Sequence, residues 1–129
     1  MAQIIVNNVQ KVFKTPGKDV IALKDINLEI KQGEFVCLLG PSGCGKSTLL
    51  NAVAGFALPS AGEITVEGRK ITGPGPDRGM VFQEYALFPW MTIAQNIAFG
   101  LEVQKKSKAE IDLTVNQLLD LLHLNDFRD

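Results

Sequence analysis

The sequence has few cysteines and no long apolar run. Two cysteines among 129 residues are too few for a disulfide framework, so a reduced, cytosolic chain is the simplest expectation. The longest apolar runs, such as Phe35–Leu39, fall far short of the ~20 residues that span a bilayer. Met1-Ala2-Gln3 does not open a basic segment followed by an apolar one, so we expect no secretory signal.

The sequence also lacks a charge excess of either sign. Lys and Arg total 13 and Asp and Glu total 14, which gives a net charge of -1. A near-neutral chain has no strong general field for nucleic acid or acidic lipid, and we expect no nucleic-acid partner. Hydrophobic residues make up 46% and charged residues 21%, which are ordinary values for one globular domain and not for a disordered chain.

Apolar patterns predict several short strands. Ile4–Phe13 mixes apolar and polar residues as an edge strand would, and a turn at Thr15–Lys18 follows it. The alternation across Ile26–Ile30 predicts a half-buried strand. Phe35–Leu39 is continuous and apolar, which predicts a strand covered on both faces. Further short strands are expected at Ile64–Val66 and Met80–Phe82.

Three helices are predicted from spacing and capping signals. The first runs over Lys46–Phe56. Thr92 and Gln95 fit a capping box, and the helix that they open should run to about Phe99 and end at Gly100. A second capping box, at Ser107 and Glu110, precedes an apolar stripe at helical spacing. The stripe comprises Ile111, Val115, Leu118, Leu119 and Leu122, widened by Leu121 and Leu124.

One segment has the spacing of a phosphate-binding loop. It is a glycine, four residues and Gly-Lys-Ser, and it comprises Gly40, Pro41, Ser42, Gly43, Cys44, Gly45, Lys46, Ser47 and Thr48. Glycines let the backbone curl so that successive N–H groups point at phosphate oxygens, and the helix that follows favours anions at its N-terminus. Lys46 should reach the outer phosphates, the Ser47 hydroxyl should ligate Mg²⁺, and Thr48 should support the inner phosphate.

Two other interpretations of this segment are disfavoured. An accidental glycine turn would match the pattern in roughly one chain of this length in a few hundred. The buried-looking strand before the loop and the apolar helix after it argue further against chance. A dinucleotide-binding fingerprint fails because Thr48 stands where its third glycine should be.

With this loop placed, nearly the whole chain resembles the N-terminal half of an ABC transporter ATP-binding subunit. The resemblance rests on the opening Val9–Phe13, the loop Gly40–Thr48 and the run Val81–Gln83. The stretch Gly73–Gln83, followed by Leu87–Thr92, is similar to the importers of nitrate, sulfonate, taurine and bicarbonate. The implied fold class is α/β, a P-loop NTPase core of ABC type with an N-terminal antiparallel β layer. It would be incomplete, with residues 1–129 as the N-terminal part of a single domain.

The resemblance also implies roles for residues outside the loop. Phe13 would stack on adenine, although its residue type alone favours a core position in an edge strand. Val20 would pack near the ribose, and Gln83 would bind Mg²⁺ near the attacking water. A docking surface for a transmembrane permease subunit would lie near Leu87, Phe88, Trp90 and Met91. A second ATP-binding subunit would complete a dimer that is peripheral on the cytoplasmic face of the cell membrane.

The family's signature motif, its Walker B strand and its switch histidine are not in this sequence. Without the Walker B carboxylates, the positioning and charge stabilisation of phosphoryl transfer are incomplete. Whether the chain is an enzyme therefore stays open between a transport ATPase and a remnant that binds nucleotide, or a partner, without hydrolysis. A GTPase is disfavoured because no Asn-Lys-X-Asp is present, and a small-molecule kinase leaves Phe13 and Gln83 unexplained.

Overall fold

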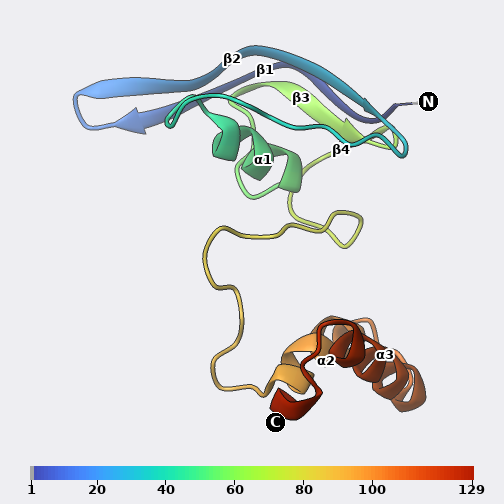
Figure 1. Cartoon of the computed structure of the whole chain (residues 1–129). Coiled ribbons are helices and arrows are strands. Elements are labelled where there is room, and N and C mark those ends of the chain that lie inside the picture. The colour runs from blue at the N-terminus through green and yellow to red at the C-terminus, as the bar shows by residue number, and fades with distance from the viewer. Residues whose placement is uncertain (1) are drawn as a thin grey trace. The chain divides into compact units, whose positions relative to one another are not determined.

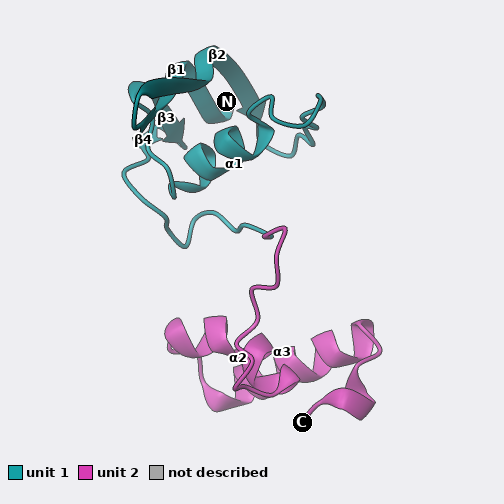
Figure 2. Cartoon of the chain, turned by 90° about the vertical axis from the view of Figure 1, so that its left-hand side faces the viewer, with its two compact units in different colours: residues 1–81 teal, residues 82–129 magenta. Residues whose placement is uncertain are grey.

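The computed structural model describes residues 2–129, which form two compact units that divide between residues 81 and 82 (Figure 2). The first unit begins with a long antiparallel hairpin of β1 (Ala2–Thr15) and β2 (Lys18–Lys31) (Figure 1). The turn between them falls at Pro16 and Gly17, as predicted, and Gly17 takes the left-handed φ of 86°.

The first strand is central in the sheet and does not lie at its edge. β3 (Ala61–Val66) pairs with the other side of β1, and β4 (Arg69–Lys70) extends the sheet in the order β2-β1-β3-β4. The edge prediction for Ile4–Phe13 was therefore wrong. The mixed pattern of this segment arises because Val6 and Val9 are buried whereas Ile5 is 40% exposed.

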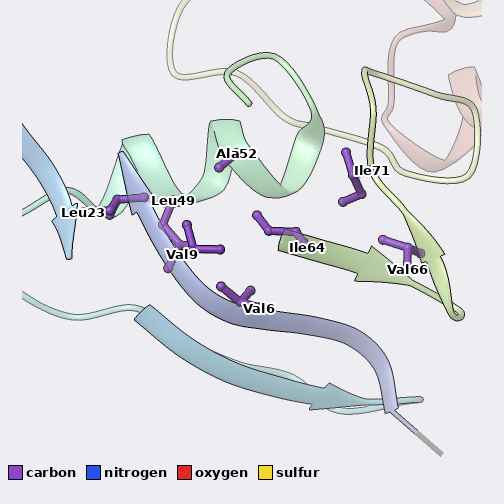
Figure 3. Close-up of a cluster of buried hydrophobic side chains, with 8 residues drawn as sticks. All are labelled: Val6, Val9, Leu23, Leu49, Ala52, Ile64, Val66 and Ile71. Atoms are coloured by element: carbon purple, nitrogen blue, oxygen red, sulfur yellow. The ribbon is translucent and has the colours of Figure 1, made fainter. Parts of the chain in front are cut away.

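The core of the first unit lies between this sheet and one face of α1 (Lys46–Ala54) (Figure 3). Leu49 and Ala52 from the helix join buried side chains of the strands and of the segment that follows them. These are Val6, Val9, Leu23, Ile64, Val66 and Ile71. The half-buried alternation predicted for Ile26–Ile30 is confirmed within β2. The helix ends at Ala54, two residues before the predicted end at Phe56, and Gly55 is its left-handed cap.

Two predicted strands do not form. Phe35–Leu39 and Met80–Phe82 take no regular structure, and Phe35, Leu39 and Val81 are 91%, 93% and 96% exposed. Only Leu38 of the first run packs partly on the core. A strand needs a hydrogen-bonded neighbour, and within residues 2–129 no segment pairs with either run. The apolar pattern was identified correctly, but the strands and the burial that it predicted were wrong.

The second unit is helical. α2 (Ile93–Val103) and α3 (Lys108–Leu121) pack around Ala98, Val115 and Leu119, and a short 3₁₀ turn, η1 (Asn125–Phe127), follows. Both predicted capping boxes are confirmed. Gly100 lies inside α2 and does not end it. The left-handed residue after the helix is Lys105, at φ 57°. The apolar stripe is buried only in part, since Leu121 is 73% exposed.

Candidate functional site

The loop Gly40–Gly45 curls tightly before α1 begins at Lys46. Gly43 and Gly45 take left-handed φ values of 81° and 95°, which favour glycine. The Cys44 N–H donates to the Pro41 carbonyl at 3.3 Å and closes the turn. A Cβ on Gly45 would lie 2.7 Å from the carbonyl oxygen of Ala22, so β2 approaches the loop too closely for any other residue. The glycines that the motif requires are therefore needed at these positions.

The Lys46 side chain turns back over its own loop. Its Nζ donates to the carbonyl oxygens of Gly40 and Pro41, the latter at 2.8 Å, and lies 3.4 Å from the Sγ of Cys44. The ammonium therefore sits among the backbone atoms of the loop, where a phosphate could exchange for the two carbonyl partners. An ionised acceptor makes a stronger hydrogen bond than a neutral carbonyl, which favours that exchange.

The N-terminus of α1 differs from those of α2 and α3. Gly45 provides no side chain to cap α1, and its first turn carries no acidic residue. Thr92 and Ser107 cap the other two helices with their hydroxyl groups. The first N–H groups of α1 therefore have no side-chain cap and could donate to an anion, at the positive end of the helix dipole. Ser47 is exposed in this first turn and Thr48 is half-buried, so the residues present fit a phosphate chain.

Phe13 and Val20 lie together at the far end of the first hairpin. They are directly opposite each other in the β1–β2 register and are 43% and 47% exposed. The Ala22 carbonyl lies against Gly45 at the end of the phosphate loop, and Val20 is two residues before Ala22 in β2, about 7 Å at strand spacing. The structure thus brings both side chains to the same end of the unit as the loop.

Lys11 is a residue that the sequence alone did not single out. Its Nζ lies 5.3 Å from the centroid of the Phe13 ring, a cation–π contact, and donates to the Leu58 carbonyl at 2.8 Å. The sequence did contain a signal for this contact: Lys11 and Phe13 are two residues apart in one strand, and residues i and i+2 share a face. Lys11 occupies one face of the ring, and the other face is the one that a base could use.

Gln83 belongs to the second unit. It lies in an exposed bend just after the first unit ends, and its role toward Mg²⁺ stays a prediction. In the same unit Leu87 and Trp90 are 68% and 75% exposed, as a docking surface requires. Phe88 and Met91 are half-buried, and the Phe88 ring packs on Phe99 at 4.6 Å between centroids.

Asn96 holds the segment that carries these residues. Its Oδ1 accepts from the Phe88 N–H at 2.8 Å, and its Nδ2 donates to the carbonyls of Phe88 and Thr92 at 3.2 and 2.9 Å. Asparagine is unfavourable inside a helix, which was the signal available in the sequence. These bonds fix the loop before α2 in one conformation.

The side chains and helices of residues 2–129 bear on metal binding and on membrane insertion. Residues 2–129 contain no group of three or more His, Cys, Asp and Glu placed to hold a metal ion. A Mg²⁺ at this loop would use the Ser47 hydroxyl and phosphate oxygens, a ligand set that Mg²⁺ commonly takes. No helix in the same range has the length and apolar character needed to cross a bilayer.

Comparisons with known proteins agree on one family. A family model described as "ABC transporter" matches residues 23–129. The taurine import ATP-binding protein TauB of Roseobacter denitrificans is 48% identical over 130 aligned residues, covering 100% of this chain and 48% of that protein. The nitrate import ATP-binding protein NrtD of Synechocystis sp. is 49% identical over 124 residues, covering 96% and 47%. The chain thus spans about half the length of these relatives.

A solved structure matches the fold. It is a dimeric post-hydrolysis state of the ATP-binding cassette MJ0796 bound to ADP and Pi, with a TM-score of 0.84 and 32% identity. The match covers 97% of this chain and 60% of that one. A second dimeric structure of the same bacterial cassette gives a TM-score of 0.82.

Proposed function

Because this chain belongs to the ABC transporter family, and within it to the ATP-binding subunits of importers, we propose that it binds Mg-ATP on the loop Gly40–Thr48. Its fold is the α/β P-loop core of ABC type with an N-terminal antiparallel β layer, present in part. Residues 1–129 would be the N-terminal part of one such domain. The observation that carries the proposal is the Lys46 ammonium over a glycine loop that opens an uncapped helix.

Different residues would contact different parts of the nucleotide. The N–H groups from Gly43 to Thr48 would hold the phosphates, Lys46 would neutralise the outer ones, and Ser47 would ligate Mg²⁺. The bound Mg²⁺ supplies further neutralisation of the phosphate charge. Phe13 would stack on the base with its free face, and Val20 would pack beside the ribose, since the two are neighbours across the hairpin.

We propose that hydrolysis by this chain alone stays near background. Phosphoryl transfer depends on a positioned water and on groups that stabilise charge in the transition state. Gln83 could orient such a water, but the sequence contains no Asp-Glu pair at the end of an apolar strand to assist it. Binding and turnover are therefore separable in this chain.

We further propose the setting in which the nucleotide is used. The subunit would act at the cytoplasmic face of the membrane, docked on a transmembrane permease, and energise solute uptake. The relatives are named for the import of taurine and nitrate, and the solved cassette is dimeric. A second ATP-binding subunit and a permease are accordingly the partners of this proposal.

Calorimetry with Mg-ATP tests the proposal directly. The wild-type chain should bind weakly but measurably, and Lys46→Ala should bring binding below detection by removing the charge that meets the phosphates. Lys70→Ala, which removes an exposed lysine of β4 in the same unit, is the matched control and should bind normally. Steady phosphate release by the wild-type chain that disappears in Lys46→Ala would overturn the claim about hydrolysis. Equal binding by both variants would overturn the site.

A further inference from the structure

The end of the β1–β2 hairpin extends past the rest of the sheet (Figure 1). Pairing of β1 with β3 ends where Gln10 meets Ala61, whereas its pairing with β2 continues to Thr15. Phe13 therefore lies in a part of β1 that, among residues 2–129, has a strand partner on one side alone. A two-stranded ribbon is marginally stable by itself, so the position of this ring depends on contacts from outside the hairpin.

The segment that follows α1 supplies such contacts. The Ser60 N–H donates to the Gln10 carbonyl at 2.8 Å, and the Val12 N–H donates to the Ser60 Oγ at 3.0 Å. These bonds take the place of a strand partner on the β3 side of β1. They also fix the position of the Leu58 carbonyl, which is two residues away from Ser60 and precedes Pro59.

Lys11 joins this segment to the Phe13 ring. Its Nζ donates to the Leu58 carbonyl at 2.8 Å and lies 5.3 Å from the centroid of the ring. Register shifts in the β1–β2 pairing flank Lys11 on both sides, because β2 carries one extra residue on each side of Leu23, its partner. Such bulges redirect side chains and are common next to functional sites. No carboxylate of residues 2–129 pairs with this ammonium, so its partners are the ring and the carbonyl.

This contact matters for a ligand that stacks on Phe13. An exposed phenylalanine loses side-chain freedom when a base covers it, and a ring that is already held in place loses less. A cation over an aromatic face contributes favourable free energy even at an exposed site. Since the Lys11 ammonium covers one face, the half-exposed ring presents its other face in a fixed orientation.

We propose that Lys11 is a positioning residue of the nucleotide site, which holds the Phe13 ring in the orientation that stacks on the base. The inference rests on the base contact of the proposed function and adds the residue that prepares that contact. Lys11 touches neither base nor phosphate in this role and acts through Phe13. Two alternatives are a purely structural role in the hairpin and a long-range attraction between the ammonium and the phosphates.

Two ligands separate the base from the phosphates: Mg-ATP, and inorganic tripolyphosphate with the same Mg²⁺. Lys11→Met keeps the aliphatic stem of the side chain and removes its ammonium. Calorimetry of the full chain should show Mg-ATP binding weakened about three-fold to ten-fold, the usual size of an exposed cation–π contact together with one immobilised side chain. The affinity for tripolyphosphate should not change. Lys11→Arg keeps the cation and the donor, and should retain most of the Mg-ATP affinity.

Lys14→Met is the matched control. It removes the same charge from an exposed lysine of the same strand, and adjacent residues of a strand point to opposite faces. This variant should bind both ligands as the wild-type chain does. In a Phe13→Leu background, Lys11→Met should have no further effect on Mg-ATP, because the ring through which Lys11 acts is gone. Retained tripolyphosphate binding shows in each case that the loop is still folded.

Each other outcome overturns the inference. Equal losses for the two ligands in Lys11→Met would indicate a hairpin or long-range charge effect, and a loss that persists beside Phe13→Leu would indicate direct contact with the nucleotide. Unchanged Mg-ATP binding in Lys11→Met, with binding weakened in Phe13→Ala, would leave the stacked ring without need of Lys11. If neither variant affects Mg-ATP, the proposed base contact itself fails. A wild-type chain that binds neither ligand would overturn the nucleotide site as a whole.

Discussion

Phe13 and Val20 face each other across the β1–β2 hairpin, and the Lys11 ammonium lies over the Phe13 ring. The pair forms a half-exposed apolar platform at the end of the hairpin, near the glycine loop Gly40–Gly45. An aromatic ring with one covered face can stack a base only on the other face. The proposed contacts to the base and to the phosphates therefore fall on different elements, which would make them separable by mutation.

We expect Phe13→Ala to weaken Mg-ATP binding by about ten-fold or more, because a base stacked on an aromatic ring contributes about 1–3 kcal/mol. The affinity for inorganic tripolyphosphate should not change, since that ligand has no base. Ile5→Ala, another partly exposed apolar residue of β1, is the matched control. Competition calorimetry measures both ligands. Equal losses for ATP and tripolyphosphate would show that Phe13 supports the loop and does not contact the base.

Cys44 and Cys37 give a second probe of the phosphate loop. Both thiols are exposed, but only Cys44 lies within the loop, 3.4 Å from the Lys46 ammonium. Saturating Mg-ATP should slow alkylation of Cys44 several-fold and leave Cys37 unaffected, because bound phosphates would cover the loop. Mass spectrometry of labelled peptides gives both rates in one sample. Protection of both thiols, or of neither, would contradict the assignment of the loop.

Gly55 and Gly68 should respond differently to the same substitution. Both take left-handed φ values, 90° and 76°, so alanine should cost each about 1–2 kcal/mol of stability. A Cβ on Gly55 would also lie 2.2 Å from the Gly73 carbonyl oxygen, whereas Gly68 has nothing within 4 Å. We therefore expect Gly55→Ala to cost about 1–3 kcal/mol more. Hydrogen exchange of the β1 amides reports the difference, and equal protection in the two variants would disprove the close approach.

The exposed apolar run Phe35–Leu39 should make the chain self-associate. Phe35 and Leu39 are 91% and 93% exposed, and exposed apolar clusters drive association. Changing both to serine should shift the sedimentation profile toward monomer. Changing Leu113 and Leu121 to serine, two exposed leucines of α3, is the control and should have a smaller effect. A wild-type chain that stays monomeric at high micromolar concentration would contradict this expectation.

The start of α3 should loosen in acid. The Ser107 backbone N–H, the Ser107 hydroxyl and the charge of Lys106 together hold the pKa of Glu110 below its ordinary value of 4.5. A carboxyl with a lowered pKa in the folded state contributes stability above about pH 4.5, which is lost as the pH falls through its folded value. Exchange of amides at the start of α3 should therefore rise in that window. Glu110→Gln should flatten this pH dependence, and an unchanged profile would mean that another group is responsible.

Local signals in the sequence predicted much of the fold because they act over a few residues. The two capping boxes, the hairpin turn and the helix after Gly45 all appeared as expected. Each depends on a backbone conformation or a hydrogen bond within about one turn. The phosphate loop belongs to this group, since its glycines act through their own φ angles and its lysine bonds to carbonyls a few residues away.

Tertiary structure alone decided which segments became strands and which side chains met. Phe35–Leu39 has the pattern of a buried strand, but strand pairing is non-local and no described segment pairs with it. β1 became central because β3 adds to its second side, which nothing within Ile4–Phe13 encodes. The C-terminal segment meets the first turn of α2 through the hydrogen bond from the Ala94 N–H to the Arg128 carbonyl, between residues far apart in the sequence. Composition and spacing specified the chemistry of each segment, and long-range packing determined which segments came into contact.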